Sequence, residues 1–281
     1  MTALRIRDLH GRYRPAIAEP GIYDVPADLY HADPCAEPSI GAGGLHTLIT
    51  DCPALYWHAS ALNPLRPAFD TKAYLFGRAA HLLLLEPQRF FAGVKILPHG
   101  FRANSDAGKA VLGAARRVGQ MVLKMAEFEV LVAMKTAVMA HDFAGMAFLD
   151  GQPERTLVWR DTETGVLLRC RPDFLPANGR HIPDYKTAAS ARPDRFVRDA
   201  YAFGYHMRAA HYLDGIAAVT GTAPDSYFFV VQEKTPPYLV TCVTLDSAAI
   251  DWGRIQNRKA IHLFADCLAA DRWPGYADEV V

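Results

Sequence analysis

The chain has 281 residues, of which 51% are hydrophobic and 21% are charged, and this is the composition of an ordinary globular protein. A chain of this length buries a sizeable core as one large domain or as two small ones. Thirty basic and thirty acidic residues cancel, which excludes a general electrostatic attraction to nucleic acids or membranes, so any phosphate-binding surface has to be local.

The cysteines and the N-terminal residues indicate the cellular compartment of the protein. The five cysteines are widely scattered and form no Cys-x-x-Cys pair, which predicts a reduced, intracellular protein and argues against a metal cluster held by thiolates. The opening stretch "MTALRIRDLHGRYRP" has no apolar signal core, and the apolar run "HLLLLEP" is far too short to cross a membrane. We therefore expect a cytoplasmic protein with no membrane partner.

The first half of the chain reads as mainly helical. Residues 1–38 are rich in proline and predict an irregular arm with one short strand. A helical rhythm broken by Pro53 predicts two short helices in "GGLHTLITDCPALYWHAS". A stronger helix is predicted in "FDTKAYLFGRAAHLLLLEP", with Asp70 as its cap and Pro87 ending it. Two amphipathic helices follow, in "NSDAGKAVLGAARRVGQMVLKM" and "EFEVLVAMKTAVMAHDFAGMAFL".

The pattern changes at Gly151 and becomes rich in strands. A hairpin around "DTETG" is predicted in "RTLVWRDTETGVLLRCRPDF", and a third short strand in "HIPDYKTA". Helical rhythm returns in "RPDRFVRDAYAFGYHMRAAHYLDGIAAVTG". Two strands around a Pro-Pro turn follow in "DSYFFVVQEKTPPYLVTCVTL", and a last helix runs from about Asp246 to Asp271.

These elements predict the fold class and the division of the chain. We expect an α/β protein with a central mixed sheet flanked by helices, plus an N-terminal helical subdomain. The whole chain, 1–281, is expected to be one domain. Its parts are an irregular arm (1–38), a mainly helical part (39–150), a catalytic sheet core with helices (151–245) and a C-terminal helix (246–281).

The stretch "RPDFLPANGRHIPDYKTA" places two carboxylates and a lysine on neighbouring strands. Carboxylates from adjacent strands, here Asp173 and Asp184, are typical ligands of Mg²⁺. Asp184 and Lys186 are two residues apart, so on a strand they project to the same face, while Tyr185 projects away with its carbonyl free to turn toward the metal. A lysine there can orient or deprotonate an attacking water and neutralise charge on a phosphate.

A plainer interpretation has similar weight on spacing alone. It is a solvated hairpin whose carboxylates pair with nearby arginines (Arg169, Arg171 and Arg180). The dipeptide Pro-Asp also occurs at Asp194 and Asp225, so that half of the pattern is common in this chain.

Several motifs in order resemble those of a nuclease superfamily. "RPDF…DYKT" resembles the Pro-Asp…Asp/Glu-x-Lys signature of the restriction-endonuclease-like nucleases. "GRAAHLLLLEP" is similar to the Gly-x-x-x-His motif of the RecB-type branch, with Gly77 expected to let another backbone pack close. "YHMRAAHYLDG" is similar to the Gln-x-x-x-Tyr helix. With "LHTLITDCPALYWHA" and "NSDAGKA", residues 37–245 resemble the RecE-type exonucleases (exonuclease VIII) and their phage relatives.

This resemblance implies roles for individual residues. Asp173 and Asp184 would be catalytic metal ligands and Lys186 the catalytic lysine. His81, Glu154 and the carbonyl of Tyr185 would complete the metal site. Without the resemblance, His81 reads as a packed core histidine and Glu154 as a charge at a strand end. Glu86, about 140° round the helix from His81, reads as surface charge.

The resemblance also implies contacts to DNA, from Arg171, Arg208 and Tyr212. Arg208 stands where the motif has glutamine, and an arginine can reach a phosphate but cannot both donate and accept as an amide does. Packing of the helix is the alternative for Tyr212. A run of basic residues between the helices reads as a solvated face or as a surface that follows phosphates. Its members are Arg102, Lys109, Arg116, Arg117 and Lys124.

The function implied is a Mg²⁺-dependent exonuclease that degrades double-stranded DNA from its ends. The resemblance further implies two metal ions, with Mn²⁺ as a substitute, and 5′ to 3′ resection that leaves 3′ single strands for recombination. It implies a single-strand annealing protein as partner and a ring-shaped homo-oligomer. The alternatives are an endonuclease or nickase of the same superfamily and a non-catalytic DNA-binding protein that keeps the fold.

Overall fold

A computed structural model describes residues 5–7, 13–66 and 72–276 of the chain. Its main sheet has three strands: β11 (His181–Ala188), β12 (Ser226–Glu233) and β13 (Val240–Thr244). The central strand β12 is parallel to β11 and antiparallel to β13. The expected mixed sheet is therefore present, and the stretch "HIPDYKTA" is one of its edge strands.

A second sheet contains the predicted hairpin. Its strand order is β3 (Gly21–Tyr23), β8 (Thr156–Arg160), β9 (Leu167–Cys170) and β4 (Ser39–Ile40), with β4 parallel to β9 and the other pairs antiparallel. A short pair, β7 (Gly151–Pro153) with β10 (Phe174–Pro176), is separate from it. The predicted hairpin thus lies in a sheet separate from the main mixed sheet.

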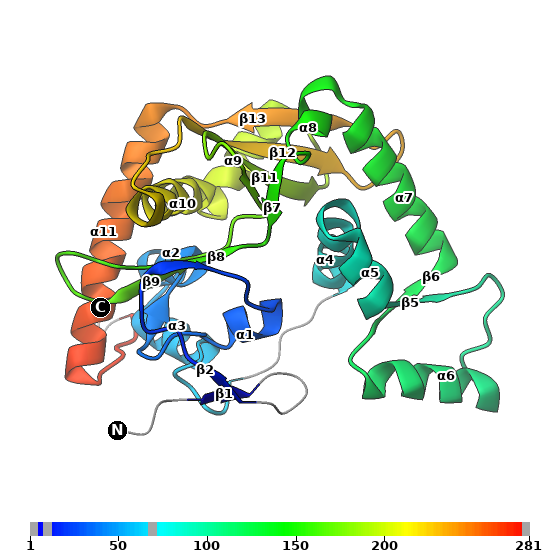
Figure 1. The fold of residues 1–281 in the computed structure, drawn as a ribbon, viewed down its shortest axis with the longest axis horizontal. Helices are drawn as coiled ribbons and strands as arrows, with labels where there is room; N and C mark the ends of the chain where they lie inside the picture. Colours follow the sequence, from blue (N-terminus) through cyan, green and yellow to red (C-terminus); the bar gives the residue numbers. More distant parts are fainter. Residues whose placement is uncertain (1–4, 8–12, 67–71, 277–281) are drawn as a thin grey trace.

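Two hydrophobic cores cover the two faces of the main sheet. Tyr227, Phe229 and Val231 of β12 enter one core, together with α2 (Ala42–Thr50), α10 (Tyr205–Thr220) and α11 (Ser247–Ala270). Phe228 and Val230 enter the other, with α4 (Lys72–Leu85) and α7 (Met125–Ala140). Figure 1 shows these helix groups on opposite sides of the sheet. Burial on both faces explains why β12 reads as a continuous apolar run.

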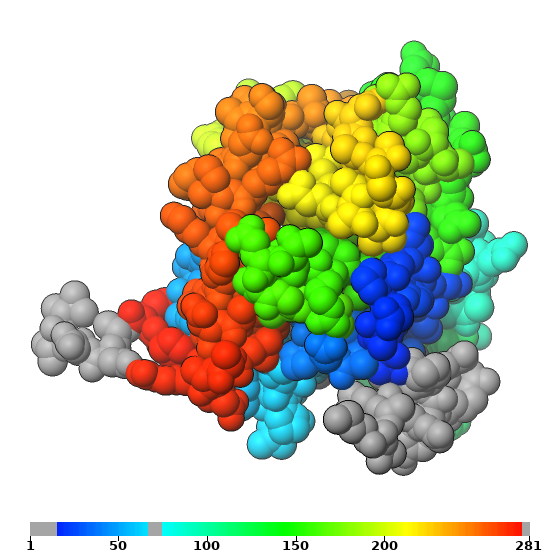
Figure 2. Space-filling view, turned by 60° about the vertical axis from the view of Figure 1, so that its left-hand side comes forward, coloured from blue at the N-terminus to red at the C-terminus, as the bar shows by residue number. Residues whose placement is uncertain are grey.

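Close packing joins the last two long helices. A Cβ at Gly253 of α11 would lie 2.4 Å from the backbone oxygen of His206 in α10, so only glycine fits at this crossing. The β8–β9 hairpin lies against α11, as Figure 2 shows, and Arg258 there contacts the Asp161 carboxylate at 2.9 Å. The hairpin, α10 and α11 therefore form one packed unit.

Most predicted helices are present, with small shifts of their ends. The two short helices around Pro53 are α2 and α3 (Pro53–Ala59), and the predicted C-terminal helix is α11. Helix α4 ends at Leu85 because Pro87 starts another helix, α5 (Pro87–Gly93), while its predicted cap, Asp70, lies outside the described residues. Helix α8 (Asp142–Met146) precedes β7 and the hairpin, and the helices that follow β11 are α9 (Pro193–Ala202) and α10.

Two expectations for the first half of the chain are wrong. The arm is not irregular, because it forms β1 (Arg5–Arg7), β2 (Tyr13–Pro15), β3, and α1 (Ala27–His31) before β4 begins. The helix predicted through residue 125 stops earlier, as α6 (Asp106–Arg117). After Gly119, at φ +69°, the chain turns into β6 (Met121–Lys124), which pairs in parallel with β5 (Val94–Leu97). Among the described residues, no helix is both long and apolar enough to span a bilayer.

The buried imidazole of His211 makes the fold sensitive to acid. Its Nε2 lies 3.0 Å from the backbone oxygen of Arg169, an arrangement that fits a neutral ring donating a hydrogen bond. Burial lowers the pKa of His211 to about 4, whereas a histidine in an unfolded chain titrates near 6.5. The unfolded state therefore takes up the proton first. The stability contribution is complete above about pH 6.5 and is lost as the pH falls toward 4.

We expect His211→Gln to lose less stability in acid than the wild type. An amide can still donate to the Arg169 carbonyl but does not titrate, so the difference in unfolding free energy between pH 7 and pH 4.5 should shrink by roughly 2–3 kcal/mol. Urea unfolding followed by circular dichroism at both pH values measures this. Equal losses in the two proteins would contradict the assignment.

Candidate metal centre and active site

Asp173 lies where the hairpin, the short strand pair and the main sheet meet. Its Oδ2 accepts a hydrogen bond of 2.7 Å from the backbone N–H of Tyr185 in β11. Its own backbone oxygen accepts a hydrogen bond of 3.1 Å from the N–H of Glu154, directly after β7. Asp173 thus fixes the backbone positions of two other candidate residues, Tyr185 and Glu154.

Three predicted metal ligands come together at this point. One ligand atom from each of His81, Glu154 and Asp173 lies within 4.8 Å of the others, and Nδ1 of His81 is 3.5 Å from Oδ2 of Asp173. The three residues come from α4, the end of β7 and the β9–β10 connection. Two carboxylates and an imidazole are donors that suit a divalent cation.

Asp184 and Lys186 lie on the same face of β11, as the alternation of side chains in a strand requires. The ammonium group of Lys186 is in ion-pair contact with the Asp184 carboxylate and lies 3.8 Å from Oδ2 of Asp173. Asp184 is 1% exposed, and neither of its carboxylate oxygens has a hydrogen-bond partner within the described residues. A buried carboxylate without hydrogen bonds is costly, so this donor fits a bound cation.

Tyr185 turns its side chain to the other face, as expected. Its ring packs 5.0 Å from that of His81, and its hydroxyl donates to Oε1 of Gln232 at 2.5 Å. Gln232 in turn donates to the backbone oxygen of Met134 in α7. This supporting role of Gln232 was not expected from the sequence. A glutamine at the end of the apolar run "YFFVVQE" was the available signal, because a buried amide needs hydrogen-bond partners. Metal ligation by the Tyr185 carbonyl remains a prediction.

The acidic groups of the site are driven to different pKa values. Burial alone would raise the pKa of Asp173, but the nearby Lys186 ammonium and His81 hold it below its usual value. Burial, together with the Asp173 charge, raises the pKa of Asp184 and raises that of Glu154 to about 7. Burial lowers the pKa of His81, so the imidazole is neutral and able to bind a metal. A bound cation would offset the repulsion among the carboxylates.

Arg171 holds Glu154 in place. Its Nε is 2.5 Å from Oε2 of Glu154, and its Nη1 donates to the Val25 carbonyl and, at 3.3 Å, to Thr156. Glu154 itself has φ +56°, a left-handed conformation that is uncommon outside glycine. Arg171 is 7% exposed, so these contacts give it a positioning role on Glu154 in place of the expected DNA contact.

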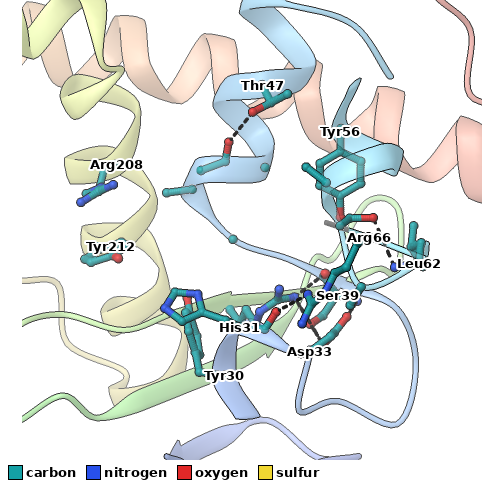
Figure 3. A pocket seen from close by; sticks show the side chains of 18 residues that line it. Tyr30, His31, Asp33, Ser39, Thr47, Tyr56, Leu62, Arg66, Arg208 and Tyr212 are labelled. Atoms are coloured by element: carbon teal, nitrogen blue, oxygen red, sulfur yellow. Dashed lines mark hydrogen bonds and ion pairs between the residues drawn. The ribbon is translucent and has the colours of Figure 1, made fainter. Parts of the chain in front are cut away.

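Arg208 and Tyr212 lie one turn apart on α10, beside the carboxylates. The guanidinium of Arg208 lies 5.5 Å from the centre of the Tyr205 ring, and Nζ of Lys186 lies 5.7 Å from the same ring. Both residues line a pocket next to the metal centre (Figure 3). Contact of these two residues with DNA remains a prediction.

Two smaller expectations near α4 are wrong. A Cβ at Gly77 would meet only the Thr187 hydroxyl, at an ordinary 3.5 Å, so the close backbone packing expected there is not present. The side chain of Glu86 is only 11% exposed and pairs with Arg89 at 2.8 Å, and its charge contributes to the raised pKa of Glu154. Glu86 is therefore part of the surroundings of the site and not plain surface charge.

Addition of Mn²⁺ or Mg²⁺ should stabilise the protein. A ligand that binds only the folded state at a hundred times its dissociation constant adds about 2.7 kcal/mol, which appears as a higher melting temperature. Asp173→Asn should abolish this shift, whereas Asp194→Asn, at an exposed position in α9, should retain it. Thermal unfolding with and without the cation measures both. A shift that survives in Asp173→Asn would place the cation elsewhere.

Removal of Arg171 should destabilise the protein through Glu154. Arg171→Ala leaves a buried carboxylate without its counter-charge, which typically costs about 3–5 kcal/mol. Glu154→Gln removes that charge, so the double variant should lose clearly less stability than the sum of the two single variants. Urea unfolding of the four proteins gives the coupling. Additive losses would show that the pair does not act as a unit.

Comparison with known proteins agrees with the fold. A family model described as a PDDEXK-like domain of unknown function (DUF3799) matches residues 48–280. No curated protein matches the chain. The crystal structure of a candidate exonuclease from Eubacterium rectale superimposes with a TM-score of 0.62 at 13% identity, over 92% of this chain and 95% of that chain.

An alkaline exonuclease from Laribacter hongkongensis, at 13% identity, covers 66% of this chain and 97% of its own, with a TM-score of only 0.26. The expected restriction-endonuclease-like fold is confirmed by the family match and by the first of these structures. The chain belongs to the family of PDDEXK-like domains of unknown function, DUF3799.

Proposed function

We propose that this protein is a Mg²⁺-dependent deoxyribonuclease of the RecE type, which resects double-stranded DNA from 5′ to 3′. The observation that carries the proposal is the convergence of Asp173, Asp184 and Lys186 from two connected segments, with His81 and Glu154 completing the set. These are the parts that hydrolysis of a phosphodiester by a metal-assisted water requires.

Each residue has a defined part in this chemistry. Asp173, Asp184, Glu154 and His81, with the carbonyl of Tyr185, would hold Mg²⁺, and the number of oxygen donors suits two ions, with Mn²⁺ as a substitute. When bound, the metal supplies an acidified water and charge neutralisation. Lys186, 3.8 Å from Asp173, would orient that water or take its proton and would offset charge on the scissile phosphate. Arg171 keeps Glu154 turned toward the site.

The exonuclease reading rests on the order of the motifs, and it agrees with the description of the similar structure from Eubacterium rectale as that of a candidate exonuclease. Products with 3′ single strands would pass to a single-strand annealing protein in phage-type recombination. We further propose a single catalytic domain, a ring-shaped homo-oligomer and a cytoplasmic location. The alternatives are an endonuclease or nickase with the same centre, and a DNA-binding protein that does not cleave.

Linear and covalently closed duplex DNA distinguish these functions. We expect Mg²⁺ to support degradation of the linear form only. Lys186→Ala should lower the rate by about 10²- to 10⁴-fold, the usual contribution of a positioned proton-transfer group, and Asp173→Ala should lower it at least as far. Arg198→Ala, at an exposed site in α9, is the control. Gel analysis over time gives the rates.

Each other outcome has its own meaning. Cleavage of closed circles would favour the endonuclease. Binding of DNA without any cleavage, in the wild type as in the variants, would favour the non-catalytic protein.

A further inference from the structure

Residues 94–124 form a segment that projects from the body of the protein, and we call it the α6 projection. Its base is the parallel pair of strands β5 and β6, and its outer part is helix α6. Val94 and Leu123 at the base enter the hydrophobic core of α4 and α7, whereas only two small residues of α6 are buried. Figure 1 shows α6 away from the larger sheets, beyond α4 and α5. The projection is therefore anchored to the layer that carries His81, and its outer helix is largely exposed.

The α6 projection concentrates positive charge in a chain whose formal net charge is zero. It contains six basic residues and one carboxylate, that of Asp106, whereas the other 250 residues of the chain contain 24 basic and 29 acidic residues. The projection thus has a net charge of +5, and the rest of the chain has −5. All six basic residues are exposed, namely Lys95, Arg102, Lys109, Arg116, Arg117 and Lys124.

The basic residues on and before α6 are not neutralised by the protein itself. Within the described residues, Arg102, Lys109, Arg116 and Arg117 form no ion pair. The helix dipole accounts for Arg116 and Arg117, which lie in the last turn of α6 beside its negative end. It does not account for Arg102 and Lys109. Both lie near the positive end of that dipole, where a cation without a partner is disfavoured.

The local backbone fixes where these charges lie. Ser105 caps α6 by accepting a hydrogen bond of 3.0 Å from the N–H of Gly108. A Cβ at Gly108 would clash with the backbone oxygen of Arg102, so only glycine lets the preceding loop pack against the first turn of the helix. Lys109 and Arg116 are seven residues apart, so they share one face of the helix and lie about 10 Å apart along its axis. The charges therefore belong to a preformed surface.

The other residues of the projection indicate the class of partner. The centre of a protein interface is rich in apolar and aromatic residues and poor in lysine, but Val118 is the only large apolar residue that is exposed here. Surfaces that bind single-stranded nucleic acid add aromatic rings on which bases stack. The only phenylalanine, tyrosine or tryptophan of the projection is Phe101, which is partly buried. Lysine and arginine without such rings suit the phosphates of a duplex, contacted without regard to sequence.

We propose that the α6 projection binds the phosphate backbone of double-stranded DNA outside the active site. The inference rests on the proposed nuclease function and adds to it a surface that holds the part of the duplex not yet degraded. Because the base of the projection is anchored beside α4, a duplex that rests on α6 keeps a fixed position relative to the helix of His81. Two contacts with one DNA molecule bind more tightly than either alone, so this surface favours processive degradation.

Binding without cleavage tests the surface directly. Metal-free protein in chelator is titrated into a fluorescent duplex of about 30 base pairs, roughly 100 Å long, and anisotropy gives the affinity at several salt concentrations. Each lost phosphate contact reduces the slope of log affinity against log salt by about 0.9. We expect the double variant Lys109→Gln, Arg116→Gln to lose about 2 units of slope and Arg102→Gln, outside the helix, to lose about 1 unit.

A matched control removes the same charge from another surface. The double variant Arg254→Gln, Lys259→Gln changes α11, which lies on the other side of the molecule from α6 in Figure 1. Its salt slope should equal that of the wild type. Glutamine is a good helix former, and circular dichroism of each variant checks that the helices are retained. Arg102→Gln tests the inference independently of α6 helix content.

A second measurement follows degradation of a labelled linear duplex in Mg²⁺, with an excess of unlabelled duplex added just after the start. The wild type and the α11 control should shorten each labelled molecule severalfold further before releasing it than the Lys109→Gln, Arg116→Gln variant does. Equal shortening by all three proteins would contradict the holding role of the projection.

The outcomes separate this inference from the proposed function. An unchanged salt slope in the α6-projection variants, with DNA still degraded, would overturn the inference and leave the nuclease in place. A slope reduced for single-stranded DNA but not for the duplex would also overturn it. So would an assembly of wild-type chains that sedimentation shows to dissociate in these variants at unchanged slope, because the projection would then contact a second copy. Absence of any DNA degradation, with the slope reduced in these variants only, would support the surface and refute the nuclease.

Discussion

The hydrogen bond from the Tyr185 backbone to the Asp173 carboxylate joins the parts of the site. It ties the connection after the hairpin to the edge strand of the main sheet, while the Asp173 carbonyl holds the backbone of Glu154. The first bond joins a backbone N–H to the Asp173 side chain and the second joins two backbone groups, so both tie the site to the path of the chain. The relative positions of the proposed metal ligands are thus set by the fold, which is the preorganisation that catalysis requires.

The burial of so many charges together needs a physical reason. Asp173, Asp184 and Glu154 lie close to one another beside the basic groups of Lys186, Arg171 and Arg208, and their pKa values are pushed in opposite directions. The Asp184 carboxylate is buried with the Lys186 ammonium as its ion-pair partner and no other hydrogen-bond partner among the described residues, and burial of such a pair is weak evidence for stability. The proposed cation, with these oxygens as its ligands, would offset the repulsion among the carboxylates.

The part of the site that lies on one strand could be predicted from the sequence, because alternation alone places Asp184 and Lys186 together. His81 and Glu154 come from distant segments, and only the resemblance to a motif order pointed to them. Sequence spacing does not reveal burial, so it could not show that Arg171, for which a DNA contact was expected, faces inward to Glu154. Strand β6 escaped prediction because its apolar residues continue the helical pattern of residues 104–118 beyond Gly119, and β5, which lies before that helix, was assigned to no element.

Both hydrophobic cores include residues of β12, so we expect the two cores to unfold cooperatively. Its residues alternate between the layer of α4 and α7 and the layer of α10 and α11, and its neighbour β11 carries the lysine. In a protein with separable cores, the half remote from the chemistry could melt while turnover continued. Here both helix layers pack against the same strand, β12, one on each face. Heat inactivation and the loss of helical structure should therefore coincide in one cooperative step.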